Sequence, residues 1–119
     1  MAIIEVEPVT TKRSRRAFVG FPWRVYEDDP NWVPPLISER LAYLDPQRGP
    51  FYEHADVALF LARRGRQVAG TIAAFVDHLL IAHTGERKGG LGFFELLEDD
   101  AVAERLLNTA CRWLRDRDS

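Results

Sequence analysis

Hydrophobic and polar residues follow two different periods along the chain, and these periods predict where strands and helices lie. Residues 3–9 alternate, with Ile4 and Val6 on one side, as in a half-buried strand. Near the other end, apolar residues recur at helical spacing, with acidic residues before them and arginines after them, which suits the helix dipole. We therefore expect a helix from a cap at Asp99 or Asp100 to about residue 115. Its apolar stripe consists of Ala103, Leu106, Leu107, Ala110, Trp113 and Leu114.

The front half of the chain predicts helices that are separated by prolines. Thr10 or Thr11 can cap the first helix, and Pro22 is expected to end or kink it because proline has no amide hydrogen to donate. A short second turn would follow through Trp23 and Tyr26. The aspartates and prolines of residues 28–35 predict turns. Residues 36–44 predict another helix, and a loop is expected at residues 45–50. In that helix Leu36, Ile37, Leu41 and Leu44 are expected on one side, with Ser38, Glu39 and Arg40 towards water.

The middle of the chain changes to strand periodicity. Residues 56–62 form an almost continuous apolar run, and residues 63–66 contain the glycine that a tight hairpin needs. Residues 67–76 predict the returning strand, and both of its faces are apolar, which is typical of a sheet with helices packed on it. Residues 89–96 predict a further strand, whereas the pattern of residues 78–88 is ambiguous.

These elements predict an α+β layered protein, with helices packed on a mostly antiparallel sheet in the order β-α-α-β-β-β-α. The 119 residues suit one domain, 1–119. The composition, 46% hydrophobic and 29% charged residues, is that of an ordinary globular protein.

Charge and cysteine content narrow the classes of partner and compartment. The net charge of −2 gives no field that would recruit nucleic acid or acidic lipid. One cysteine, Cys111, excludes an internal disulfide, which suits a reducing cytoplasm. No apolar run approaches the roughly 18 residues of a membrane span. We therefore expect a soluble cytoplasmic protein whose partners include neither nucleic acid nor membrane.

Two blocks rich in aromatic residues and proline resemble a known family. They read FPWRVYEDDPNWVPPL at residues 21–36 and PFYEHADVALFL at residues 50–61, followed by GTIAA at 70–74 and GFFE at 92–95. These blocks resemble the amino-terminal part of a mostly uncharacterised group of bacterial proteins that look like members of the GNAT superfamily of N-acetyltransferases. The resemblance covers nearly the whole chain.

This resemblance implies a fold and a cofactor. GNAT proteins open with a strand, two helices, three antiparallel strands and a helix, which is the order predicted above. They hold acetyl-coenzyme A in a wedge between the fourth and fifth strands, and here the fourth strand would be residues 91–96, with no fifth strand after it. We therefore expect no complete acetyl-coenzyme A site and no cofactor in the isolated chain. The uncovered edge predicts self-association or a complementing chain.

The resemblance also places a pyrophosphate-binding loop at the start of the helix that follows the fourth strand. Residues 95–100 read Glu-Leu-Leu-Glu-Asp-Asp, without glycine and with several carboxylates. Like charges 4 Å apart repel by about 1 kcal/mol in water. This segment therefore predicts weak binding of a phosphate.

Few residues are candidates for a site. Glu95 stands where a strand-end carboxylate could deprotonate an amine, although it could equally be an ordinary strand-end residue. The resemblance places the cofactor beside this strand, which makes Phe93 and Phe94 candidates for contacting it. The aromatic block could line a ligand groove or partner surface, or pack in the core; it consists of Trp23, Tyr26, Trp32, Phe51 and Tyr52.

The remaining reactive side chains predict no further chemistry. Asp77 and the histidines lack a recognised zinc-ligand spacing, so no metal is expected; the histidines are His54, His78 and His83. Cys111 lies on the apolar side of its helix and is expected to pack there. The basic residues 12–16 are expected to be solvated.

Three functions remain open. The chain could be a non-catalytic relative of the GNAT superfamily, an acyl-coenzyme A-dependent N-acetyltransferase completed by oligomerisation or by a partner, or a small protein-binding module.

Overall fold

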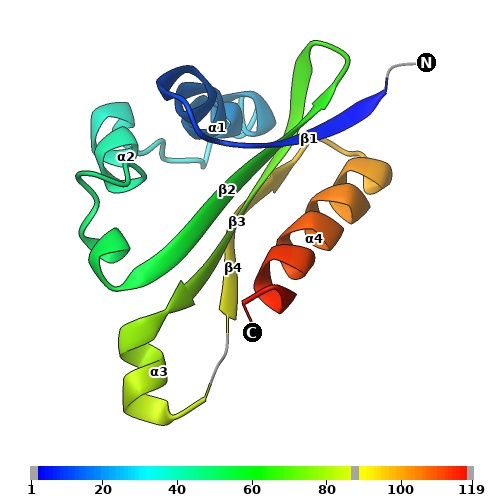
Figure 1. The fold of residues 1–119 in the computed structure, drawn as a ribbon. Coiled ribbons are helices and arrows are strands. Elements are labelled where there is room, and N and C mark those ends of the chain that lie inside the picture. The colour runs from blue at the N-terminus through cyan, green and yellow to red at the C-terminus, as the bar shows by residue number, and fades with distance from the viewer. Residues whose placement is uncertain (1–2, 87–88, 118–119) are drawn as a thin grey trace.

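A four-stranded antiparallel sheet with helices on both faces forms the body of the computed structural model, which describes residues 3–86 and 89–117 (Figure 1). The strands lie side by side in chain order and are β1 (Ile4–Pro8), β2 (Ala55–Arg64), β3 (Gln67–Asp77) and β4 (Gly89–Leu96). The helices are α1 (Lys12–Val25), α2 (Ile37–Tyr43), α3 (His78–Thr84) and α4 (Asp100–Arg115), with a 3-10 turn η1 (Pro50–Glu53). The predicted α+β class and element order are confirmed, with η1 and α3 as additions.

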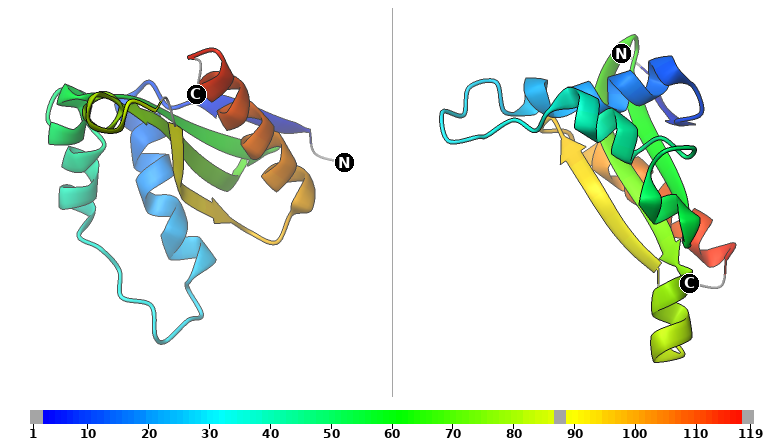
Figure 2. Two further views of the ribbon diagram at one scale, coloured as in Figure 1. Left: turned by 90° about the horizontal axis from the view of Figure 1, so that it is seen from below. Right: turned by 90° about the vertical axis from the view of Figure 1, so that its left-hand side faces the viewer.

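The sheet separates two hydrophobic layers. Successive residues of a strand point to opposite faces, so Phe60 of β2 packs towards α4 while its neighbour Leu59 packs with Phe18 and Val19 of α1. Figure 2 shows α1 and α2 on one side of the sheet and α4 on the other. The two apolar faces predicted for residues 67–76 are thereby both covered.

Helix α4 begins and packs largely as its sequence predicts. Asp99 is the N-cap, and its side chain accepts a hydrogen bond from the Val102 amide. The buried stripe runs every fourth residue and consists of Val102, Leu106, Ala110 and Leu114. Val102 therefore joins the predicted stripe, whereas Ala103, Leu107 and Trp113 are only half-buried.

The predicted break in the first helix is wrong, because α1 continues through Pro22 to Val25. Pro22 lies in the last turn, so the missing amide removes only the bond to the Phe18 carbonyl, near the helix end. The Pro22 carbonyl still accepts from the Tyr26 amide at 3.0 Å. The end of α1 is also fixed to β3, because the Arg24 guanidinium donates to the Val68 carbonyl at 2.9 Å.

Helix α2 buries only part of its predicted apolar side. The residues Leu36 and Ile37 are 63% and 50% exposed, although both were predicted to lie on the apolar side of the helix. Leu44, just after the helix, is buried, and Arg40 is half-buried rather than in water. The helix thus packs through its second half.

The ambiguous segment after β3 forms α3, which projects beyond the end of the sheet (Figure 1). Asp77 caps it by accepting from the amides of Leu79 and Leu80. Gly85, at a φ of 75°, ends it in the left-handed conformation that favours glycine. Residues 87 and 88 of the ambiguous segment lie outside the described residues.

We expect Gly70→Ala to destabilise the fold. A Cβ on Gly70 would lie 2.7 Å from Leu106 Cδ1 and 2.9 Å from Val102 Cγ1, so these side chains, or α4 itself, would have to move away from β3. Overpacking of this kind costs about 1–3 kcal/mol. Thermal unfolding should show a lower midpoint.

The matched control is Gly20→Ala in α1, where a Cβ would meet no described atom within 4 Å outside the adjacent residues and the backbone of its own helix. Replacing a glycine inside a helix stabilises by about 0.5–1 kcal/mol, so this midpoint should rise slightly. Equal midpoints for the two variants would contradict the packing of α4 on Gly70.

Candidate functional site

A β-bulge in β4 sets the geometry of the candidate site. Thr71 pairs with Glu95 and Ala73 pairs with Gly92, so one residue of β3 faces both Phe93 and Phe94. Phe93 has a φ of 48°, in the left-handed region that non-glycine residues seldom adopt. The buried Thr71 hydroxyl donates to the Phe93 carbonyl at 2.8 Å and holds the bulge in place.

Phe93 and Phe94, the two candidates for contacting a cofactor, lie in different surroundings because of this bulge. Phe93 is half-buried and packs against the core on the side of α1 and α2. Phe94 is 40% exposed, and it lines neither of the two cavities described below. Of this candidate pair, the structure therefore brings only Phe93 to the site.

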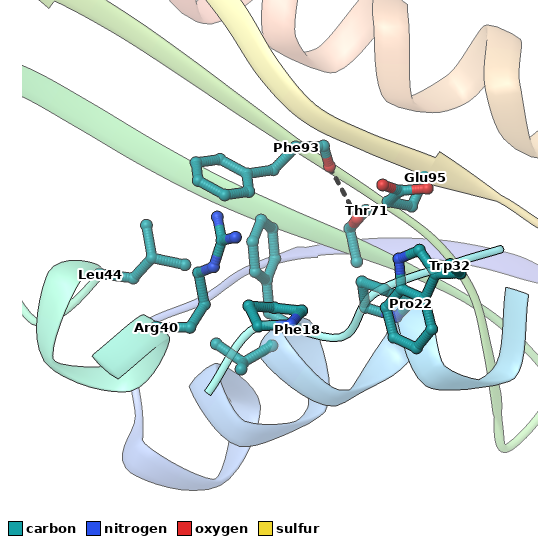
Figure 3. A pocket seen from close by; sticks show the side chains of 10 residues that line it. Phe18, Pro22, Trp32, Arg40, Leu44, Thr71, Phe93 and Glu95 are labelled. Carbon is teal, nitrogen blue, oxygen red and sulfur yellow. Dashed lines mark hydrogen bonds between the residues drawn. The ribbon is translucent and has the colours of Figure 1, made fainter. Parts of the chain in front are cut away.

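A cavity of about 120 Å³ lies between the sheet, α1 and α2; we call it the Glu95 cavity (Figure 3). Its lining is mostly apolar, with one carboxylate and one guanidinium. The lining residues are Phe18, Val19, Pro22, Trp32, Pro35, Arg40, Leu44, Thr71, Phe93 and Glu95. Among these residues, Glu95 carries the one carboxylate, the type of group that can act as a general base towards a bound amine.

Tyr26 holds the Glu95 carboxylate from the end of α1. Its hydroxyl donates to Glu95 Oε2 at 2.7 Å. This hydrogen bond, with a smaller contribution from burial, raises the pKa of Tyr26 above its usual value of 10.0. The phenol therefore stays protonated at neutral pH and keeps donating to the carboxylate.

The aromatic candidates of the first block come together around this hydrogen bond. Trp32 stacks on Tyr26 with ring centroids 5.3 Å apart, and Trp23 meets Trp32 edge-on at 5.2 Å. Such pairs contribute about 0.5–1.5 kcal/mol each beyond burial. They place Trp32, from the segment that connects α1 to α2, on the wall of the Glu95 cavity.

Arg40 is a site residue that sequence reasoning placed wrongly. Its guanidinium lies 5.0 Å from the centre of the Phe93 ring, instead of facing water. In Figure 3 it lies at the other end of the Glu95 cavity from Glu95. The signal was present in the spacing, because residue 40 lies three residues after Ile37 and four before Leu44, on one helical face.

A second cavity, of about 170 Å³, adjoins the first; we call it the Gly92 cavity. Its lining contains no charged side chain and consists of Tyr43, Leu44, Phe51, Tyr52, Val57, Leu59, Ala73, Phe75, Gly92 and Phe93. The Tyr52 hydroxyl donates to the Leu44 carbonyl at 3.0 Å, and burial raises the pKa of Tyr52. The aromatic block is thus divided, with Phe51 and Tyr52 in this second cavity.

The start of α4 is occupied by the protein's own carboxylate. Asp99 accepts from Arg64 Nε at 2.8 Å and from Arg64 Nη2 at 3.0 Å, and it also caps the helix through the Val102 amide. The Arg64 hydrogen bonds hold the pKa of Asp99 below its usual range. A pyrophosphate, which the GNAT resemblance implies here, would meet a carboxylate at the amides that it needs.

Two histidines each lie beside one aspartate carboxylate. His54 Nδ1 lies 2.9 Å from Asp77 Oδ1, and His78 Nε2 lies 3.1 Å from Asp56 Oδ2. Burial acts to raise the pKa of Asp77, but the hydrogen bonds from His54 and the first α3 amides lower it overall. Residues 3–86 and 89–117 contain no group of three or more His, Cys, Asp or Glu side chains placed to hold a metal ion.

The other sequence candidates lie away from both cavities. Cys111 is half-buried on α4, on the opposite face of the sheet. Of the basic residues at the start of α1, Arg15 lies 3.6 Å from Asp45 as an ion pair, whereas Lys12, Arg13 and Arg16 are exposed as expected. In the part of the chain that the structure describes, no helix has the length and apolarity to cross a membrane.

Comparisons with known proteins find two bacterial relatives. The chain is 40% identical over 117 residues to the bacterial ceramide synthase of Caulobacter vibrioides, covering 98% of this chain and 30% of the relative. It is 32% identical over 112 residues to the protein YghO of Escherichia coli, covering 94% of this chain and 28% of that protein. No family model and no solved structure matches.

These relatives confirm the expected likeness to bacterial proteins over nearly the whole chain, and the finer GNAT relationship stays a prediction. The chain spans less than a third of each curated relative that it matches.

We expect Glu95→Gln to lower the pKa of Tyr26 towards 10.0, because the variant removes the negative charge that holds the phenol proton. NMR titration of the tyrosine ring carbons measures this shift. Tyr52 is the internal control, since burial is the largest cause of its raised pKa and Glu95 is not among the causes. An unchanged Tyr26 pKa would show that the two groups are not paired in solution.

Proposed function

We propose that this chain forms the amine-binding side of a bacterial N-acyltransferase, whose acceptor is the amino group of a long-chain amino alcohol. The observation that carries the proposal is the Glu95 carboxylate, held by Tyr26 at 2.7 Å and facing a largely apolar cavity. The ceramide synthase similarity, 40% identity along 98% of this chain, supports the same chemistry. Ceramide formation joins an acyl group to an amine: the amide C–N bond forms while the C–S bond of an acyl-coenzyme A donor breaks, and coenzyme A leaves as the thiol with the proton that the amine gives up.

The site's own residues suit the acceptor half of that reaction. An amine is protonated at neutral pH and must lose a proton before its nitrogen can attack an acyl carbon. Glu95 can take this proton directly or through a water, and Tyr26 keeps the carboxylate oriented towards the cavity. Positioned general bases contribute about 100- to 10,000-fold to a rate. The mostly apolar lining offers a bound molecule few polar contacts besides Glu95 and Arg40.

Backbone groups of β4 can assist on the acyl side. β4 is an edge strand, so the outward amides next to the bulge are not used by another strand of the described sheet. Backbone amides aimed at a carbonyl oxygen stabilise the negative charge that develops on it. Such a role agrees with the cofactor position that the GNAT resemblance implies beside Phe93.

The start of α4 favours a second candidate, a non-catalytic GNAT relative. Asp99 fills the helix end where the phosphates of coenzyme A would bind, so the described residues do not fit that group. Calorimetric titration of the chain with acetyl-coenzyme A should give no heat at millimolar ligand. Measurable binding by the isolated chain would remove this second candidate.

The acyltransferase proposal is tested in a chimera in which this chain replaces the matching segment of the Caulobacter relative. We expect the chimera to acylate a long-chain amino alcohol when given a fatty acyl donor, with the amide measured by mass spectrometry. Glu95→Gln should lower the rate by about 100-fold or more, because the proton acceptor is lost.

The matched control is Glu104→Gln, which changes an exposed carboxylate on α4 at the opposite face of the sheet. It should leave the rate unchanged. Circular dichroism of both chimeras confirms that they are folded. A folded Glu95→Gln chimera with full activity would exclude Glu95 as the base.

A further inference from the structure

The Gly92 cavity has no role in the proton transfer described above, and it has the properties of a hydrocarbon site. It is bounded by β2, β3 and β4 on one side and by the end of α2 and η1 on the other. Its polar atoms are few, and the Tyr52 hydroxyl is already bonded to the Leu44 carbonyl. The cavity is partly open, but its mostly apolar lining gives water few partners, so it favours an apolar occupant.

Gly92 accounts for the open space. Gly92 pairs with Ala73, and paired residues of adjacent antiparallel strands point to the same face, so a side chain at residue 92 would project to the side of α1 and α2. A Cβ there would meet no described atom within 4 Å outside the adjacent residues. The φ of Gly92 is not positive, so the backbone does not require glycine.

Gly90, two residues earlier on the same strand, shows the contrast. A Cβ on Gly90 would overlap Cζ of Phe75, so the Phe75 ring already fills the space that this glycine leaves. No described side chain fills the corresponding space beside Gly92. The absence of a side chain at residue 92 therefore contributes directly to the volume of the cavity.

The volume sets how much hydrocarbon fits. The cavity measures about 170 Å³. An engineered apolar cavity of about 150 Å³ binds benzene, which has six carbons. The Gly92 cavity thus has room for about six carbons of an alkyl chain.

The two cavities share a wall, which links hydrocarbon to amine. Phe93 and Leu44 line both, and Phe93 is the half-buried residue at the bulge. Charge directs the polar end of a ligand, because an ammonium is attracted to Glu95 and repelled by Arg40 at the other end of the Glu95 cavity (Figure 3). The Arg40 guanidinium can donate to a hydroxyl of an amino alcohol.

We infer that the Gly92 cavity binds about six carbons of the hydrocarbon tail of a long-chain amine, which passes Phe93 while its amino group lies at Glu95. The identity of the polar end rests on the proposed function. The hydrocarbon site itself rests on the cavity.

The test titrates the chain calorimetrically with hexylamine, octylamine and decylamine. Each buried methylene should strengthen binding about fourfold. Gly92→Val places three carbons in the cavity, so decylamine should bind roughly tenfold or more weakly while hexylamine changes by less than about threefold. Gly92→Ala should lie between wild type and Gly92→Val.

Three controls accompany the series. Gly20→Ala fills open space on α1 outside both cavities and should leave all three affinities unchanged. The melting point of Gly92→Val should equal or exceed that of the wild type, because valine suits a strand and fills a void. Glu95→Gln should weaken the three amines by one common factor.

Two results would overturn the inference. Chain-length dependence that is the same in wild type and Gly92→Val would exclude the cavity as the tail site, whether or not the chimera forms amides. Equal affinity for decanoate and decylamine would exclude the amine at Glu95. A different combination separates the two claims. If the chimera is inactive, but Gly92→Val weakens binding of decylamine far more than binding of hexylamine, the proposed function is excluded and the hydrocarbon site is retained.

Discussion

The bulge at Phe93 is the constraint on which the candidate site depends. A non-glycine residue in the left-handed region costs on the order of 1–3 kcal/mol and persists only where neighbouring contacts hold it. Here the Thr71 hydroxyl binds the Phe93 carbonyl and Arg40 lies over the Phe93 ring. The extra residue shifts the strand, so Phe93 faces the two cavities and Glu95 comes within reach of Tyr26. In a strand without the extra residue, the residues on one side of the bulge would pair with β3 in a register shifted by one.

The end of α1 provides the second half of the site. Tyr26 reaches Glu95 only because α1 continues past Pro22 and is fixed to β3 by Arg24. Stacking of Trp32 on Tyr26 then places Trp32, from the segment that connects α1 to α2, on the wall of the cavity. The segment has no regular secondary structure of its own, so these ring contacts are a main reason that Trp32 lies there.

The two cavities together match an amphipathic molecule better than a small polar one. A carboxylate and a guanidinium lie in the first, and the second has no charged side chain. This division supports the acceptor proposed from the ceramide synthase similarity. At the start of α4, by contrast, Asp99 uses the helix amides itself, which agrees with a chain that contributes the acceptor side and leaves phosphate binding to other residues.

Local patterns in the sequence determined the order of the strands and of α1, α2 and α4 and the covering of both sheet faces, and they narrowed the cap of α4 to Asp99 or Asp100, because strand alternation, helical spacing and capping act over a few neighbouring residues. The Tyr26–Glu95 hydrogen bond joins residues 69 apart, and only the tertiary structure decided it. The same holds for the bulge, which depends on the register between β3 and β4. It also holds for Gly90 and Gly92: both are glycines, but Phe75 fills the space beside Gly90 and not the space beside Gly92. These features follow from how distant segments pack, and a periodicity in one segment carries no information about its partner.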